Sequence, residues 1–167
     1  MSTSYEFSSP DKVTVGTVGE VGARTFYLQA REASSTVTLK VEKQQVGALA
    51  TLLGRLLADL ARPGELDEGD LELDDFEDAD FVVGALAVSY DADSDRVVVL
   101  AEELVGEQDE PGDEASLALT REQAATLAIR GTRLVEAGRP PCPLCGFPLD
   151  PRGHACPRTN GHLPPLT

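Results

Sequence analysis

All three cysteines and both histidines of the chain fall in one short stretch near its C-terminus. Cys142 and Cys145 are separated by two residues and followed by glycine, a spacing with which two thiolates hold one zinc ion. A zinc ion in a structural site takes four tetrahedral ligands, mostly Cys and His. The spacing therefore predicts a zinc-binding module in which Cys142, Cys145 and Cys156 are joined by one histidine.

Two histidines compete for the fourth position. His154 and Cys156 are two residues apart, so they share one face of an extended segment. Cys156 and His162 have five intervening residues, which also lies within the range of zinc-finger modules. We favour His154 and keep His162 as the alternative. Four protein ligands leave no open position for water, so we expect one structural Zn²⁺ rather than a catalytic one.

The residues before this module alternate between strand and helix patterns. Period-2 alternation and turn signals predict strands, and apolar residues at helical spacing predict helices. The first set consists of strands at 13–18, 24–31 and 36–42, then a helix from 43 to 60. The second set consists of strands at 81–90, 96–102 and 115–119, then a helix. Thr120 and Gln123 are expected to form a capping box at the start of this helix.

This repeated order indicates an internal duplication. At an offset of 78 residues, Leu39 aligns with Leu117 and Leu49 with Leu127. One such unit buries little apolar surface, so two must pack together. We therefore predict an α+β fold in which two tandem β-β-β-α units form a two-layer body of about six antiparallel strands and two helices. The boundaries are 1–62 for the first unit, 63–80 for an acidic linker, 81–138 for the second unit and 139–167 for a zinc-ribbon-like module.

The formal net charge of −15 is concentrated in two segments. Residues 64–80 hold ten of the 29 acidic residues, and 102–114 hold seven more. Such a chain is a poor match for the phosphates of nucleic acids and for anionic membranes. The simplest interpretation of the acidic segments is solvated linkers. The alternative is a docking surface for a basic protein partner.

Sequence features also favour a cytoplasmic location. The first twelve residues lack the apolar core of a signal peptide. No apolar run approaches the roughly 18 residues of a membrane span. Cysteines gathered in one segment suit metal binding in a reducing compartment better than disulfides.

Catalytic motifs are absent from the sequence, so we expect no catalytic or cofactor-binding residues and a non-enzymatic protein. One alternative is an enzyme or small-ligand site at the seam between the units, near Gly16 and Gly84, because glycine allows a ligand to approach the backbone. We favour a bulge, or room for a neighbouring helix, at both glycines. A second alternative is a zinc ribbon that binds nucleic acid through Arg139, Arg152 and Arg158, which the net charge opposes.

Three stretches of the sequence resemble an uncharacterised actinobacterial family, domain of unknown function 3090. They are TVGEVGARTFYLQA (17–30), the acidic middle, and GRPPCPLCGFPLDPRGHACPRTNG (138–161). Members of that family occur with a histidine-phosphatase-like and a phosphatidylinositol-kinase-like protein, so the resemblance implies association with them and assigns no activity. The family motif often has an aromatic residue where this chain has His162, which favours His154. We therefore expect a zinc-containing accessory or adaptor protein.

Overall fold

The computed structural model describes residues 2–20, 22–66, 69–107 and 110–136. The chain divides into two compact units, Met1–Val135 and Glu136–Thr167, and all of the described strands belong to the first unit. The predicted zinc module and its ligands Cys142, Cys145, His154, Cys156 and His162 lie outside the described residues.

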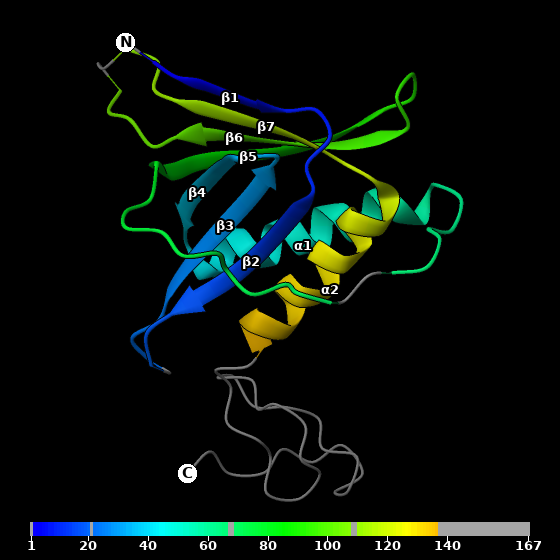
Figure 1. Ribbon diagram of the computed structural model, residues 1–167, viewed down its shortest axis with the longest axis horizontal. Helices are drawn as coiled ribbons and strands as arrows, with labels where there is room; N and C mark the ends of the chain where they lie inside the picture. The colour runs from blue at the N-terminus through cyan, green and yellow to red at the C-terminus, as the bar shows by residue number, and fades with distance from the viewer. Residues whose placement is uncertain (1, 21, 67–68, 108–109, 137–167) are drawn as a thin grey trace, which may run out of the picture. The chain divides into compact units, whose positions relative to one another are not determined.

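The described residues form seven strands and two helices, in the order that the sequence predicts plus one N-terminal strand (Figure 1). In chain order the elements are β1 (Ser4–Phe7), β2 (Lys12–Val18), β3 (Thr25–Glu32), β4 (Ser35–Val41), α1 (Lys43–Ala58), β5 (Phe81–Asp91), β6 (Arg96–Glu103), β7 (Glu114–Leu119) and α2 (Arg121–Glu136).

All seven strands form one sheet in the order β1-β7-β6-β5-β4-β3-β2. Strands β2 to β4 and strands β5 to β7 are antiparallel, as predicted, but β4 pairs with β5 and β1 with β7 in parallel. The expectation that all strands are antiparallel is therefore wrong, and the described sheet has seven strands where we expected about six. Strands β4 and β5 are joined by a helical crossover, which parallel neighbours require. Strand β1 is only four residues long and pairs with a strand 110 positions away, which no local pattern reveals.

Helix α2 begins at the predicted capping box. The Gln123 amide donates to Thr120 Oγ1, and the Thr120 amide donates to Gln123 Oε1, both at 3.0 Å. Helix α1 begins after Glu42, whose amide donates to Gln45 Oε1 at 2.7 Å. Because each box satisfies amides that the helix itself leaves free, the local sequence sets where both helices start.

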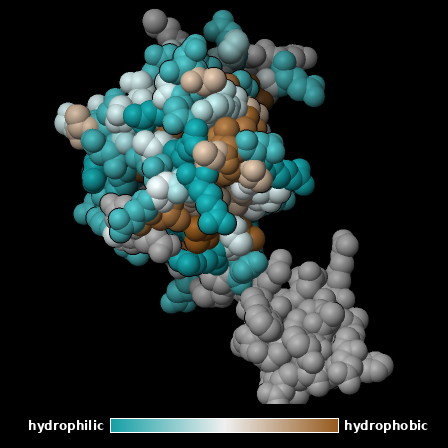
Figure 2. Space-filling view, turned by 90° about the vertical axis from the view of Figure 1, so that its right-hand side faces the viewer, coloured by the Kyte–Doolittle hydropathy of each residue, from teal (hydrophilic) through white to brown (hydrophobic). Residues whose placement is uncertain are grey.

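The core lies between the two helices and one face of the sheet. It is mainly aliphatic, with Val15, Leu28, Leu39 and Leu117 each 1% exposed or less. The helices approach each other closely at Gly131, where an added Cβ would lie 3.4 Å from Val46 Cγ1. The outer surface seen in Figure 2 is mainly hydrophilic, with hydrophobic side chains gathered in a few patches.

Candidate docking surface

The other face of β2–β4 is polar, yet much of it is buried. Lys12, Thr14, Gln29 and Thr38 are each 8% exposed or less. They alternate along their strands with core residues such as Val13 and Leu28, so they point away from the helices. Buried polar groups need hydrogen-bond partners. Those partners come from residues 69–80, which we call the acidic strap.

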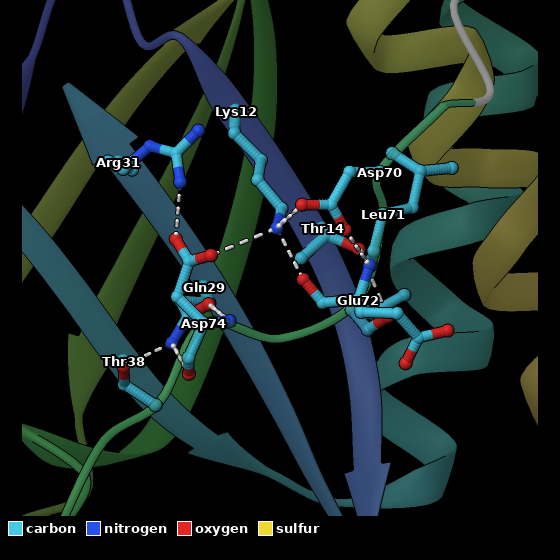
Figure 3. A network of polar contacts seen from close by, with 10 residues as sticks. Lys12, Thr14, Gln29, Arg31, Thr38, Asp70, Leu71, Glu72 and Asp74 are labelled. Carbon is cyan, nitrogen blue, oxygen red and sulfur yellow. Dashed lines mark hydrogen bonds and ion pairs between the residues drawn. The ribbon is translucent and has the colours of Figure 1, made fainter.

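Two basic side chains hold the strap through ion pairs (Figure 3). Lys12 Nζ lies 3.2 Å from Asp74 Oδ1 and 3.6 Å from Asp70 Oδ2, and it also donates to the Glu72 carbonyl. Arg31 Nη1 lies 2.8 Å from Asp74 Oδ2. The Lys12 side chain is only 7% exposed, so water screens its pairs weakly.

Uncharged side chains hold the strap backbone. Gln29 accepts from the Asp74 amide at 2.7 Å and donates to the Asp74 carbonyl at 3.1 Å. Gln29 Nε2 also donates to Thr38 Oγ1 at 2.9 Å, and the Thr14 hydroxyl donates to the Leu71 carbonyl at 2.5 Å. Side chains therefore satisfy backbone groups that a neighbouring strand would otherwise satisfy.

Apolar strap residues face the sheet. Leu73 lies against Gly16, where an added Cβ would come within 2.6 Å of Leu73 Cγ. Phe76 packs edge-on against Tyr27, with ring centroids 4.7 Å apart. The strap therefore has an apolar inner side as well as charged contacts at its start.

Most strap carboxylates point outward. The exposed acidic residues of the strap are Asp70, Glu72, Asp75, Glu77, Asp78 and Asp80. Asp74 is half-buried and paired, and Asp70 keeps 76% of its side chain exposed while pairing with Lys12. The strap thus presents a row of carboxylates on a backbone that the sheet holds in place. This segment was expected to be either a solvated linker or a docking surface.

The two glycines suspected of lining a ligand site are not brought together. Gly16 lies on β2 and Gly84 on β5, with β3 and β4 between them in the sheet. Gly16 makes room for Leu73. Gly84 lies at a β-bulge, and an added Cβ there would be 2.8 Å from Leu104 Cα. The bulge that we favoured is present at Gly84, whereas Gly16 makes room for the strap and not for a neighbouring helix.

A cavity of about 400 Å³ lies where the two halves of the chain meet. Its lining comes from the start of β2, the strap and the start of α2, and includes Lys12, Arg31, Asp70, Glu122 and Gln123. Gln123 Nε2 donates to the Pro10 carbonyl at 2.8 Å and so ties α2 to the segment before β2. The lining carries both signs of charge, which suits a polar ligand.

Arg121, the first residue of α2, organises a second charged cluster. Its side chain lies 2.9 Å from Asp95 Oδ1, to which the Tyr90 hydroxyl also donates at 2.6 Å. The Tyr90 hydrogen bond, followed by that of Arg121, lowers the pKa of the Asp95 carboxyl. Arg121 Nη1 also donates to the Ala61 carbonyl at 3.1 Å. The cluster therefore pins the β5–β6 hairpin and the segment after α1 to the start of α2.

Within the described ranges no group of three or more His, Cys, Asp or Glu side chains is arranged to hold a metal ion. In that same part of the chain no helix is long and apolar enough to cross a membrane. The predicted zinc ligands lie beyond it, so they stay a prediction.

Comparison with known families places the chain. Residues 5–156 match the family described as "Protein of unknown function (DUF3090)". The match covers most of the chain, so this mixed α+β protein belongs to that family. No curated protein and no solved structure matches it.

Proposed function

We propose that this protein is a non-enzymatic accessory or adaptor protein whose acidic strap docks a basic protein partner. The observation that carries the proposal is the two-sided strap, with Leu73 and Phe76 against the sheet and the carboxylates outside. Because contacts to the sheet already order the strap, its carboxylates lose little conformational freedom when a partner binds. A docking surface of this kind attracts a partner through charge, so binding weakens as salt rises.

A lysine-rich probe tests the charge component alone. A peptide of Ser and Lys should bind the full chain at low salt and dissociate as salt approaches the physiological range. Glu72→Gln with Glu77→Gln should weaken binding, because both side chains are exposed on the strap. Glu20→Gln with Asp59→Asn removes the same charge from exposed sites elsewhere and should have a smaller effect. Equal loss in both pairs would show that net charge alone attracts the probe.

A pull-down with the full chain then searches for the natural partner. The family resemblance makes a histidine-phosphatase-like protein and a phosphatidylinositol-kinase-like protein the first to test. A basic protein retained at low salt and eluted by salt is expected. Recovery of nothing, at low salt and again at physiological salt, would refute the adaptor proposal.

The C-terminal module is proposed to hold one structural zinc ion through Cys142, Cys145, His154 and Cys156, with His162 as the alternative fourth ligand. The support is the ligand spacing. Metal analysis of the purified chain should give about one zinc ion, lost in Cys156→Ser and His154→Ala. Zinc retained in His154→Ala and lost in His162→Ala would assign the fourth position to His162.

We also propose that the two halves arose by duplication. The supporting observation is that aligned residues have equivalent burial. Leu39 on β4 and Leu117 on β7 are both 0% exposed, and Leu49 and Leu127 are buried on the helices that follow these strands.

The cavity between the halves supports a second candidate function, the binding of a small polar ligand. Its volume of about 400 Å³ is within the range of small-molecule sites. An NMR screen with small zwitterions tests it. Shift changes centred on Arg31 and Gln123 would favour this function, and a screen without changes there would count against it.

A further inference from the structure

The strap side of the sheet changes character between its two halves. On β2–β4 that face is polar and lies under the strap. On β5–β7 that face carries the aliphatic residues Val82, Ala87, Val98, Leu100 and Ala118, with Ser89 and Ser116 among them, and Leu104 follows directly after β6. We call the six aliphatic residues the apolar face. The strand registers place Ala87 beside Leu100 and Val98 beside Ala118, and Val82 lies farther along β5, beside the exposed Lys40 of β4. Their neighbours Val97 and Val99 point into the core and are 0% exposed.

Several side chains of the apolar face are open to solvent. Leu104 is 64% exposed and Val82 is 39% exposed. These two residues are adjacent, because the Leu104 amide donates to the Val82 carbonyl at 2.7 Å. The strap, in contrast, makes its contacts with β2, β3 and β4. Contiguous exposed aliphatic side chains are typical of interaction surfaces, whereas single scattered ones are not, and here Val82 and Leu104 are adjacent.

Two carboxylates stand beside these aliphatic side chains. Glu102 lies on β6 between Leu100 and Leu104, the residue that follows the strand, and it pairs directly with Glu114 on β7. Both residues are exposed. Like charges directly opposite each other destabilise an antiparallel pair. A cation placed between Glu102 and Glu114 would relieve this repulsion, so the charge pattern fits a partner that is basic as well as apolar.

We propose that the apolar face binds a basic, amphipathic segment of a protein partner. Aliphatic side chains of that segment pack on Leu100, Leu104 and Val82, and a Lys or Arg side chain lies between Glu102 and Glu114. The inference rests on the proposed function, because the strap lies on the same side of the same sheet and supplies the longer-range attraction. The apolar face adds contacts that only a segment of complementary shape with exposed apolar side chains can make. It therefore determines which basic segments bind.

Two designed peptides of about 18 residues test this on the full chain. One is an amphipathic helix of Leu and Lys, and the other has Ser at every Leu position. The Leu/Lys peptide should bind at least about tenfold more tightly than the Ser/Lys peptide. Leu104→Ser and Glu102→Gln should each lower the affinity for the Leu/Lys peptide by about fivefold. Leu104 is mostly exposed, so its truncation leaves the core intact.

Matched variants away from the apolar face provide the controls. Val18→Ser changes a side chain that is 51% exposed at the end of β2, and Glu20→Gln removes one exposed carboxylate in the turn after it. Neither should change the affinity for the Leu/Lys peptide. If the Leu104→Ser variant binds the Leu/Lys peptide as tightly as the Val18→Ser variant does, the apolar face is not the binding site.

The same measurements separate this inference from the proposed function. Equal affinity for the two peptides would overturn the apolar face and leave charge docking by the strap intact. Binding of the Leu/Lys peptide alone, with dependence on Leu104, would support the apolar face and remove the strap as a docking surface. A dimer in sedimentation that Leu104→Ser dissociates would show that a second copy occupies the face, and would overturn the proposal.

Discussion

Gln29 and Asp74 are joined as two peptide groups of neighbouring strands would be. The Gln29 carboxamide accepts from the Asp74 amide at 2.7 Å and donates to the Asp74 carbonyl at 3.1 Å. One side chain on β3 thereby replaces an additional strand as the partner of the strap. Gln29 is 2% exposed, so these hydrogen bonds are shielded from water and their loss is strongly destabilising.

Gln29→Leu should detach the middle of the strap. The substitution keeps much of the side-chain volume but leaves the Asp74 backbone and the Thr38 hydroxyl without this partner. We expect a loss of about 1–3 kcal/mol in the free energy of unfolding. Hydrogen exchange of the Asp74 amide should accelerate more than that of core amides. Gln44→Leu, at an exposed position on α1, serves as the control and should leave that amide unchanged.

Lys12 and Arg31 should contribute unequally although both pair with Asp74. Lys12 has a side chain that is 7% exposed, against 40% for Arg31. Lys12→Met should therefore cost about 1–3 kcal/mol of stability. Arg31→Met should cost less than about 1 kcal/mol, because water screens that pair. Urea unfolding at low salt and at about 1 M salt measures both, and the effect of Arg31→Met should nearly vanish at the higher salt. Equal costs would contradict this ranking.

The stability lost in Gly16→Ala should be partly restored by shortening the side chain of its neighbour Leu73. An added Cβ meets the flexible side chain of Leu73, so Gly16→Ala should cost about 1–3 kcal/mol, and Leu73→Ala should recover part of that loss. At Gly84 the added Cβ meets Leu104 Cα, a backbone atom. Leu104→Ala should therefore rescue Gly84→Ala much less. A double-mutant cycle by thermal unfolding measures each coupling energy, and equal rescue at both sites would argue against this packing.

Tyr90→Phe should raise the pKa of Asp95 toward its usual value, because the Tyr90 hydroxyl is the main cause that lowers it. A carboxyl group whose pKa is lowered in the folded state stabilises that state above the unfolded value of about 3.9. This stabilisation is lost as the pH falls through the lower folded value. NMR titration of the Asp95 carboxyl carbon measures the shift. Tyr27→Phe, on β3, should leave it unchanged.

Local features of the sequence predicted most elements well. The predicted strand at 13–18 and helix at 43–60 correspond to β2 (Lys12–Val18) and α1 (Lys43–Ala58). The capping box at Thr120 formed as predicted. These predictions succeed because alternation, helical periodicity and capping depend on residues a few positions apart.

Long-range contacts were not predictable in the same way. The sequence shows polar residues at every second position of β2 (Lys12, Thr14) and of β3 (Gln29, Arg31), and it shows Leu73 and Phe76 within the acidic stretch. No local pattern predicts that the acidic stretch contacts these strands, because the contacts join residues some 45 to 60 positions apart. A strand that is polar on one face reads as solvent-exposed, so the buried polar face under the strap was missed.

The pairing of β1 with β7 has a consequence for protein synthesis. Ser4 lies beside Glu114, 110 positions later in the chain. At roughly 5 to 20 residues per second, the ribosome completes that stretch on the order of ten seconds after β1. Throughout this interval β1 lacks the strand edge with which it pairs in the folded protein. Among the described strands, β1 therefore joins the sheet only after β7 has been synthesised.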